Sequence, residues 1–400
     1  MNPIRNPYAP GAGSQPPELA GRNALLDQAR LTLERVKIGR SAKSFIAVGL
    51  RGVGKTVLLV RVRDLAEERG YRACLIEARD QASLTELLLP ALRRLLLDLD
   101  RIGALSEQVK RGLRVFRSFI SGLKVKHGDL ELVLDVDPEH GAADSGSLEA
   151  DLPELFIAIG KAAAARQTAV ALIIDEIQYL SEPEMSALIV ALHRVAQEGL
   201  PMVLVAAGLP QVVGLTGRSK SYAERLFDFP EVGALSRTDA ARALVEPARS
   251  EGVAFDPAAL ERIIDVTQGY PFFLQEWGYT SWNIASQSPV TAEDVDRATS
   301  EAISKLDRSF FRVRFDRLTP REKDYLRAMA ELGSSAQRSG DIAELLGIRV
   351  QAAGPLRAGL IRKGMVYSPA HGDTAFTVPL FDAFLRRIMP DWQSPAPDRN

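Results

Sequence analysis

The chain has 400 residues, of which 46% are hydrophobic and 25% charged, the proportions of an ordinary globular protein. This composition excludes disordered, collagen-like and coiled-coil proteins. With 50 Lys and Arg against 51 Asp and Glu, the formal net charge of −1 excludes a globally basic nucleic-acid coat protein, although it says nothing of local basic patches. At roughly 100–200 residues per domain, the length allows two to four domains.

The cysteine and apolar content narrow the class of protein further. One cysteine, Cys74, and four histidines exclude an internal disulfide and a structural zinc cluster, so any metal is expected on oxygen ligands. The most apolar runs, residues 169–174 and 201–210, are shorter than the about 20 residues that span a bilayer. The first 17 residues contain five prolines and no apolar stretch, so no signal peptide is expected. We therefore predict a cytoplasmic protein without a membrane partner.

Strands and helices alternate over the first 230 residues. Apolar spacing predicts helices over residues 25–36, 57–68, 83–99, 152–165 and 184–197, and short buried strands over residues 44–49, 72–78, 169–174 and 202–206. Such alternation is typical of a parallel sheet covered on both faces. We therefore predict an α/β domain over residues 17–230, preceded by a flexible Pro/Gly-rich lead over residues 1–16.

One stretch of this domain, residues 101–150, does not follow the alternation. Residues 101–127 carry seven Lys or Arg and one acid, whereas residues 128–160 carry nine acids and no Lys or Arg. A turn at residues 127–128 would place Lys126 opposite Asp129, which predicts a basic hairpin insertion followed by an acidic loop. Either these charges line a groove for DNA or a partner, or they are solvated and paired with one another.

Strand signals fade after residue 229. Helical patterning over residues 238–249, 257–267, 272–285 and 292–316 predicts a helical lid domain over residues 231–317. A capping box of Thr319 with Glu322 opens a third unit, in which helices over residues 321–332, 339–346 and 350–363 precede a hairpin with its turn at residues 371–373. Three helices and a hairpin predict a winged helix-turn-helix over residues 318–390, followed by a tail over residues 391–400.

A phosphate-loop motif stands at residues 49–56, which read Gly-Leu-Arg-Gly-Val-Gly-Lys-Thr and match G-x-x-x-x-G-K-[ST]. The motif follows a predicted strand and opens a predicted helix. In such a loop the backbone N–H groups surround phosphate oxygens, Lys55 reaches the β- and γ-phosphates, and Thr56 offers its hydroxyl to Mg²⁺. The residues expected to bind the nucleotide are Gly49, Arg51, Gly52, Val53, Gly54, Lys55, Thr56 and Val57.

A second motif supplies the carboxylates that nucleotide hydrolysis requires. The apolar stretch 169–174 ends in Asp175 and Glu176, which is the Walker B pattern. It predicts that Asp175 holds Mg²⁺ together with Thr56 and that Glu176 activates the attacking water; the alternative is a buried strand whose exit is acidic. The sequence contains no Asn-Lys-x-Asp or Thr-Lys-x-Asp motif to read guanine, so ATP is favoured over GTP.

Taken in order, these motifs resemble those of AAA+ ATPases. The resemblance rests on Pro-Glu-Leu-Ala-Gly-Arg at residues 17–22, the phosphate loop, Asp-Glu-Ile-Gln at residues 175–178, Gly-Tyr-Pro at residues 269–271 and the predicted winged helix. It covers about residues 15–390 and is nearest to the branch that joins the origin-recognition ATPases to the STAND signalling ATPases. It implies a P-loop AAA+ parallel-sheet core with a helical lid and a winged helix, bound ATP and Mg²⁺, and ATP hydrolysis. It also implies that Arg22 and Pro271 lie at the nucleotide.

The resemblance also implies a finger arginine that reaches a neighbouring subunit, and Arg225 is the nearest match; the alternative is a surface arginine. Two family features are missing. Residues 207–209 offer no polar side chain to sense the γ-phosphate, and residues 268–278 contain no arginine. With fewer groups to stabilise transition-state charge, we predict slow hydrolysis. That favours a switch over a motor, with self-association on ATP binding if Arg225 acts between subunits.

The predicted third helix of the C-terminal unit is basic. Residues 348–364 contain Arg349, Arg357, Arg362 and Lys363 and no acid, and Gln351 lies near the helix start. These cations are predicted to face DNA phosphates and Gln351 to face base edges, so duplex DNA is the expected partner. Two functions stay open. One is an ATP-driven switch that repositions the winged helix to bind DNA and to load or regulate a DNA-associated process; the other is a STAND-like signalling ATPase whose output is assembly or docking of an unidentified partner protein, without DNA.

Overall fold

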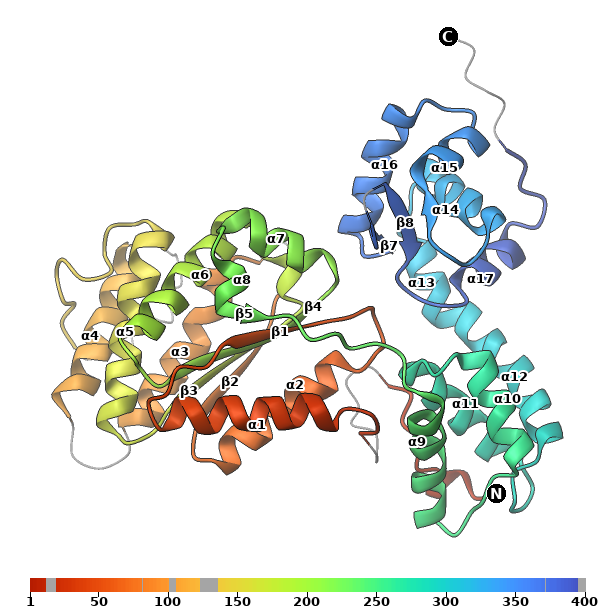
Figure 1. Cartoon of the computed structure of the whole chain (residues 1–400), viewed down its shortest axis with the longest axis horizontal. Helices are drawn as coiled ribbons and strands as arrows, with labels where there is room; N and C mark the ends of the chain where they lie inside the picture. The colour runs from red at the N-terminus through yellow and green to blue at the C-terminus, as the bar shows by residue number, and fades with distance from the viewer. Residues whose placement is uncertain (12–18, 81, 101–105, 123–135, 371, 395–400) are drawn as a thin grey trace. The chain divides into compact units, whose positions relative to one another are not determined.

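The structure, a computed structural model, describes residues 1–11, 19–80, 82–100, 106–122, 136–370 and 372–394. The chain forms two compact units, drawn in Figure 1. One, the sheet unit, consists of Arg22–Gly49 and Lys55–Val232; the other, the helical unit, consists of Met1–Gly21, Leu50–Gly54 and Gly233–Asn400. The ends of the phosphate-loop motif therefore belong to the sheet unit and its middle to the helical unit.

The sheet unit contains a five-stranded parallel sheet in the order β2-β3-β4-β1-β5. The strands are β1 (Ser44–Val48), β2 (Arg72–Glu77), β3 (Val170–Asp175), β4 (Met202–Gly208) and β5 (Phe227–Asp228). Ile174 of β3 pairs with Ala206 of β4, and Val48 of β1 with Gly208 of β4. The carboxyl ends of β1, β3 and β4 therefore meet at one edge, where ligands bind in open α/β sheets.

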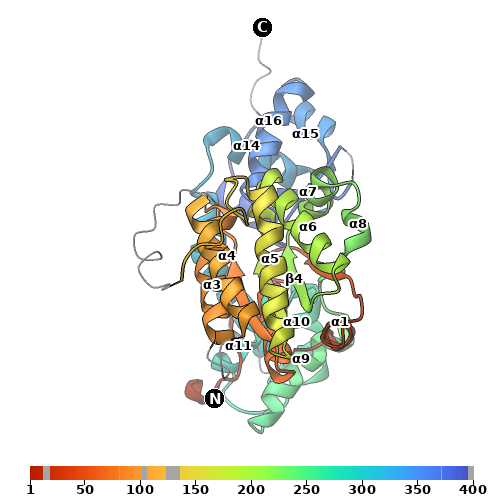
Figure 2. The same cartoon turned by 90° about the vertical axis from the view of Figure 1, so that its left-hand side faces the viewer.

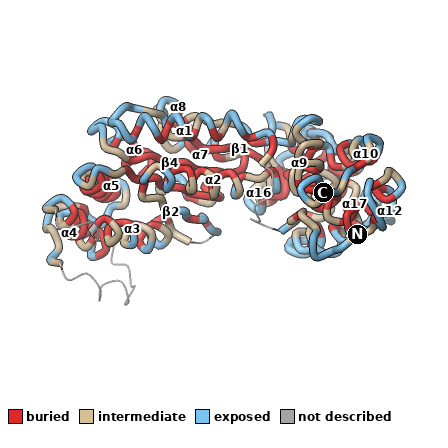
Figure 3. The backbone as a smooth tube through the Cα atoms, turned by 90° about the horizontal axis from the view of Figure 1, so that it is seen from below, coloured by how far each residue is buried: buried red, intermediate tan, exposed pale blue. Residues whose placement is uncertain are grey.

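Helices cover both faces of this sheet, as the sequence predicts. On one face, α2 (Lys55–Glu68) packs against β2, β3 and β4, and α1 (Asn23–Lys37) packs on α2. The other layer consists of α3 (Leu84–Asp100), α4 (Glu107–Gly122), α5 (Leu148–Ala165) and α6 (Glu182–Gln197), of which Figure 2 shows the first three side by side. Leu172 and Ile174 of β3 join the core of this layer. All residues of β3 and β4 are buried, which explains their continuous apolar runs. The tube at the β4 label in Figure 3 is accordingly red.

Helix α4 is a feature that the sequence reading missed. Val109, Leu113, Phe116 and Ile120 are buried and repeat at helical spacing within the basic stretch, so the segment is an amphipathic helix rather than part of a hairpin insertion. The predicted hairpin pairs, including Lys124 and Lys126, lie outside the described residues. Among the described cations, Arg111 and Arg114 form ion pairs of 2.9 and 3.6 Å with Glu139, so they pair within the stretch.

Short helices complete the sheet unit. α7 (Gln211–Ser219) and α8 (Ala223–Leu226) connect β4 to β5, and a 3-10 turn, η3 (Ile177–Tyr179), follows β3. None of the helices in the described part of the chain is long and apolar enough to cross a membrane.

The helical unit has two parts joined by a continuous helical segment. The lid part contains α9 (Arg237–Ser250), α10 (Pro257–Thr267), α11 (Pro271–Ile284) and α12 (Ala292–Leu306); α12 continues through a π-helical turn, η4 (Asp307–Phe311), into α13 (Arg312–Phe315). Phe311 contacts Phe273 of the lid part, and Phe381 and Phe384 beyond the turn. An aromatic core therefore spans both parts.

The C-terminal part contains α14 (Pro320–Leu332), α15 (Ser339–Leu345), α16 (Val350–Arg362) and α17 (Phe381–Ile388). Its antiparallel sheet has the order β6-β8-β7, from β6 (Gln337–Arg338), β7 (Val366–Tyr367) and β8 (Asp373–Phe376). The predicted capping box is confirmed, because Thr319 and Glu322 exchange hydrogen bonds of 2.8 and 3.4 Å at the start of α14. The sequence reading did not anticipate β6 or α17.

Within the first eleven residues, which were expected to form a flexible lead, Tyr8 is buried and anchors the chain to the lid part, whereas residues 2–5 are exposed. Tyr8 is 3% exposed, and its hydroxyl donates a hydrogen bond to the carbonyl of Leu244. Its ring lies over Gly278 of α11, where a Cβ would be 2.7 Å from Tyr8 Cδ1. Trp282 donates its indole N–H to the carbonyl of Asn2 over 2.9 Å. Proline and glycine content suggested flexibility, but one buried aromatic side chain and these hydrogen bonds anchor the segment. Residues 12–16 of the predicted lead lie outside the described residues.

Candidate nucleotide site

The phosphate loop has the backbone that anion binding requires. It leaves β1 at Gly49, whose N–H donates a 3.1 Å hydrogen bond to the carbonyl of Gly208, and α2 begins at Lys55. Gly52 and Gly54 have φ values of +80° and +91°, which side-chain-bearing residues rarely adopt. A glycine-rich turn that opens a helix presents N–H groups and a positive dipole end to an anion.

Lys55 is folded back onto this loop. Its side chain is 5% exposed, and Nζ donates a 3.0 Å hydrogen bond to the carbonyl of Gly49. A buried ammonium group so close to the loop is placed to neutralise phosphate charge. Val53 is 2% exposed, and Val57 lies half-buried in the first turn of α2.

The Walker residues of the sheet unit lie together as predicted. Thr56 Oγ1 donates a 2.6 Å hydrogen bond to Oδ2 of Asp175, so the start of α2 is joined to the end of β3. Burial raises the pKa of Asp175, although the hydrogen bonds from Thr56 and from the N–H of Glu176 oppose the shift. A hydroxyl oxygen and a carboxylate oxygen side by side fit Mg²⁺, which prefers oxygen ligands. The described residues contain no group of three His, Cys, Asp or Glu that would hold a metal alone, so this pair fits an ion that also takes substrate and water ligands.

Glu176, the predicted base, has a left-handed backbone with φ of 52° and ψ of 35°. Such a conformation is costly for a residue with a side chain and is concentrated at functional sites. The carboxylate accepts a hydrogen bond from Gln178. The sequence reading quoted Gln178 as part of a motif but assigned it no role.

The middle of the phosphate loop contacts the lid part within the helical unit. The carbonyl of Gly52 accepts a 3.1 Å hydrogen bond from the N–H of Phe272. A Cβ on Gly52 would lie 3.1 Å from Tyr270 Cε1, so Gly52 is in close contact with the Gly-Tyr-Pro motif. Pro271 is the first residue of α11, directly between these two contacts. The loop is therefore contacted by the Tyr270 ring of the motif and by the backbone N–H of Phe272, the residue that follows the motif.

Arg51 of the loop reaches the C-terminal part of the same unit. A Cβ on Gly364, just beyond α16, would lie 2.6 Å from Arg51 Nη2 and 2.9 Å from Nε. The guanidinium is thus at the carboxyl end of a helix, where a positive charge is favourable. Arg314 lies within electrostatic range of Arg51, and burial, followed by Arg51, lowers the pKa of Arg314 to about 10. Arg314 also lies over the ring of Phe310, which stacks on Phe272.

Comparisons with known proteins identify the fold. Residues 18–205 match the model of the AAA ATPase domain. The Walker-type ATPase PABY2304 of Pyrococcus abyssi superposes with a TM-score of 0.59 at 19% identity, covering 92% of this chain and 96% of that one. The chain has an AAA+ P-loop fold. The family match supports nucleotide hydrolysis with a divalent metal in general.

Other solved structures match with lower TM-scores. The Orc1 protein of Aeropyrum pernix, solved in complex with DNA, has a TM-score of 0.47 at 16% identity and covers 96% of each chain. The RuvB Holliday junction branch migration motor of Thermotoga maritima has a TM-score of 0.45 at 15% identity, covering 91% of this chain and 96% of that one. Residues 308–385 match a domain of unknown function, DUF8462. No curated protein is a significant match to the sequence.

Two predicted arginines lie elsewhere in the AAA+ core. Arg22 is 7% exposed and directly precedes α1. Its carbonyl accepts a 3.0 Å hydrogen bond from the N–H of Leu26 in the first turn of that helix. Residues 17 and 18 of its motif lie outside the described residues. Arg225 is exposed in the short helix α8, directly before β5. An exposed arginine at that position is accessible to a second molecule.

The predicted DNA contacts divide into two groups. Arg357 donates hydrogen bonds of 2.7 to 2.8 Å to Thr374, Ser368 and the carbonyl of Asp373, and Lys363 forms a 2.6 Å ion pair with Glu322. Both cations have partners inside the C-terminal part, although Lys363 is also exposed and Arg357 is half-buried. A charge count does not show such pairing, and the expectation that these two residues contact DNA stays a prediction. The other three residues, Arg349, Gln351 and Arg362, are exposed.

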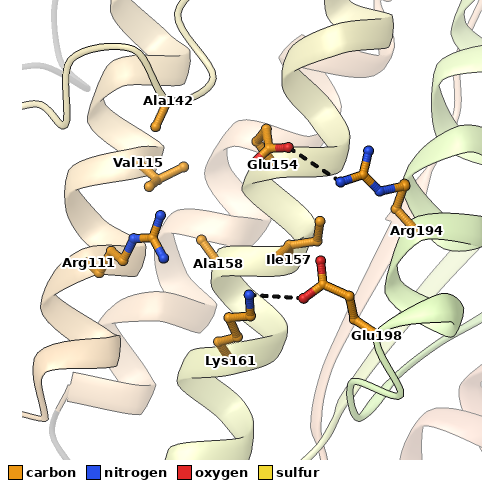
Figure 4. Close-up of a pocket in the computed structure, with 9 residues that line it drawn as sticks. All are labelled: Arg111, Val115, Ala142, Glu154, Ile157, Ala158, Lys161, Arg194 and Glu198. Carbon is orange, nitrogen blue, oxygen red and sulfur yellow. Dashed lines mark ion pairs between the residues drawn. The ribbon is translucent and has the colours of Figure 1, made fainter.

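A hollow away from the AAA+ strand ends lies among α4, α5 and α6 (Figure 4). Ion pairs cross it, Lys161 with Glu198 at 2.9 Å and Arg194 with Glu154 at 3.8 Å. Since its charges pair with one another, it gives no reason to assign a ligand.

Proposed function

We propose that this protein is an ATP-dependent switch of the origin-recognition and STAND-like branch of AAA+ ATPases, in which ATP–Mg²⁺ binding and slow hydrolysis reposition a C-terminal winged helix. One observation carries the proposal: the middle of the phosphate loop contacts both parts of the helical unit, through Gly52 with Phe272 and through Arg51 with Gly364. Phosphates on this loop would add negative charge beside Arg51 and so change its attraction to the end of α16. A ligand shifts a conformational equilibrium only when its affinities for the two conformations differ. The Arg51 contact would make the affinity for ATP depend on the position of the winged helix.

The chemistry follows from the residues at the strand ends. The oxygen of water bonds to the γ-phosphorus while the bond from that phosphorus to the β–γ bridging oxygen breaks, and the water proton passes to the carboxylate of Glu176. Lys55 stabilises the charge on the departing phosphate oxygens. Mg²⁺ held by Thr56 and Asp175 would neutralise phosphate charge when bound. The C-terminal half of β4 offers no polar side chain of its own, which supports slow turnover.

Duplex DNA is the first proposed output. The helices α14, α15 and α16 with the three-stranded antiparallel sheet support a winged helix. Arg349 and Arg362 are exposed on and beside α16, where they would contact phosphates, and Gln351 is exposed near the helix start, where it would contact base edges.

A partner protein is the second candidate, because of the exposed face of α16. Val350 is 52% exposed, and Ala352, Pro355 and Ala358 are also exposed on this helix. Small and apolar side chains suit protein docking better than phosphate contact. A cytoplasmic location and self-association on ATP binding stay predictions.

Nucleotide and DNA titrations test the proposal. Lys55→Ala should abolish ATP binding, whereas Glu176→Gln should bind ATP and lose turnover, because it keeps the shape of the side chain and removes the base. Lys161→Ala, an exposed lysine in an ion pair, is the control. An ATP-dependent rise in the fluorescence anisotropy of labelled duplex DNA would favour DNA binding as the output. ATP-dependent assembly without DNA binding would favour docking of a partner protein. Unchanged ATP affinity in Lys55→Ala would overturn the site assignment.

A further inference from the structure

Gln178 joins the ends of two strands in the sheet unit. Its Oε1 accepts a 2.9 Å hydrogen bond from the N–H of Leu209, directly after β4, and its Nε2 donates a 2.5 Å hydrogen bond to Oε2 of Glu176, directly after β3. Because a backbone N–H only donates, the Leu209 contact determines which end of the amide is the oxygen. The NH₂ group must then face the carboxylate of Glu176.

The local backbone conformation allows Gln178 to form both hydrogen bonds. Glu176 has a left-handed conformation and Gln178 lies in the 3-10 turn η3 that follows, so the two side chains meet over a short stretch of chain. On the other strand, a Cβ at Gly208 would lie 2.9 Å from Gln178 Oε1 and 3.1 Å from Ile177 Cγ2. Glycine at the end of β4 therefore leaves the space that the Gln178 side chain needs.

We propose that Gln178 is a positioning residue for the base of the hydrolytic reaction; this inference rests on the proposed ATP hydrolysis. Residues 207–209 supply no polar side chain, and the amide of Gln178 extends to that place from the end of β3. By holding Oε2 of Glu176, it orients Oε1 toward the attacking water. Gln178 itself gains and loses no proton.

The test is steady-state ATP hydrolysis, with kcat and KM measured separately. Gln178→Met keeps the side-chain length and removes both hydrogen bonds, so kcat should fall about ten- to a hundredfold with little change in KM. Gln197→Met, at an exposed position on α6, should match the unmodified protein. In Gln178→Glu, two carboxylates would face each other and share a proton, so the pH–rate profile should shift toward higher pH.

Gly208→Ala supplies an independent variant, since its methyl group would displace the amide. It should lower kcat in the unmodified background and have a much smaller effect in Gln178→Ala, where Oε1 is gone. Unchanged kcat in Gln178→Met, or a Gln178→Glu profile that superposes on that of the unmodified protein, would overturn the role of Gln178 while leaving ATP hydrolysis in place. Absence of turnover in the unmodified protein would overturn the proposed hydrolysis and this inference together.

Discussion

The hydroxyl of Thr56 lies 2.6 Å from Oδ2 of Asp175, and this hydrogen bond ties the first turn of α2 to the end of β3. Asp175 is buried, and burial raises its pKa above the ordinary value of 3.8. The carboxylate that suits Mg²⁺ is therefore held at a cost in stability when no cation neutralises it.

Asp175→Asn should raise the stability of the nucleotide-free protein at neutral pH while removing activity. The folded protein binds the Asp175 proton more tightly than the unfolded chain does. This carboxyl group therefore lowers the free energy of unfolding as the pH rises from its ordinary pKa to the raised folded value. Asparagine carries no charge, its oxygen can still accept from the Glu176 N–H, and its NH₂ group can donate to the Thr56 hydroxyl, which is able to accept. Thermal melts without nucleotide should show a higher melting temperature for the variant at pH 7, and turnover should fall on the order of a hundredfold.

The matched control is Asp228→Asn, a partly exposed aspartate on β5 that pairs with Lys43. This variant should melt near the unmodified protein and keep its activity, because an exposed ion pair contributes little. A melting temperature for Asp175→Asn below that of the unmodified protein at neutral pH would contradict the buried-charge account.

Gly278→Ala should loosen the N-terminal segment from the lid part. Its Cβ would lie 2.7 Å from Tyr8 Cδ1, so the methyl group overpacks a buried contact, and we expect a loss of about 1–3 kcal/mol. In a Tyr8→Ala background the same substitution should cost nothing further. Gly217→Ala in α7, where a Cβ meets nothing within 4 Å, should be neutral or stabilising. Chemical denaturation measures the unmodified protein and the four variants, including Tyr8→Ala alone, and equal effects at positions 278 and 217 would refute the contact.

Arg225 should act between molecules if it is a finger residue. Turnover per molecule should then rise with protein concentration, and Arg225→Ala should abolish that rise by removing the cation that stabilises transition-state charge. Arg218→Ala is the control, since Arg218 is a similarly exposed arginine nearby. A rate that is independent of concentration and unaffected by Arg225→Ala would leave Arg225 as a surface residue.

Substitution of the exposed Arg349 should affect DNA binding, whereas substitution of Arg357, which is hydrogen-bonded within the C-terminal part, should affect stability. Arg349→Ala should weaken binding to all duplexes and flatten the slope of log affinity against log salt by about 0.9, whereas Gln351→Ala should alter sequence preference. Arg357→Ala should instead lower the melting temperature, because it removes hydrogen bonds to Thr374 and Ser368. Fluorescence anisotropy at several salt concentrations measures the first two; equal salt slopes for Arg349→Ala and the unmodified protein would count against phosphate contact.

Local patterns in the sequence were sufficient to predict four of the five strands of the parallel sheet, most of the long helices that cover it, and the phosphate loop; β5, α7 and α8 were not predicted. Buried strands and amphipathic helices carry their own periodicity, and the loop glycines are contiguous. Helix α4 has the same periodicity, at Val109, Leu113 and Phe116, but its excess of basic residues drew the interpretation toward a charged insertion.

The contacts that distinguish this site depend on the register of distant segments. The hydrogen bond between Gln178 and Leu209 forms only because β3 lies beside β4 in the sheet. The contact of Arg51 with Gly364 joins residues more than three hundred positions apart in the sequence. Neither is visible in the spacing of residues along the chain. For the same reason, the sequence could not show that Arg357 and Lys363 are engaged inside the C-terminal part.

The central claim is that a nucleotide bound to the phosphate loop alters the contact between Arg51 and the carboxyl end of α16. Amide hydrogen exchange at residues 363–365 tests this claim most directly. Saturating ATP–Mg²⁺ should change exchange there several-fold in the unmodified protein and in Arg61→Ala, an exposed arginine on α2. The change should be absent in Lys55→Ala, which binds no nucleotide, and strongly reduced in Arg51→Ala with ATP bound. Identical exchange at these amides with and without bound ATP in the unmodified protein would contradict the account.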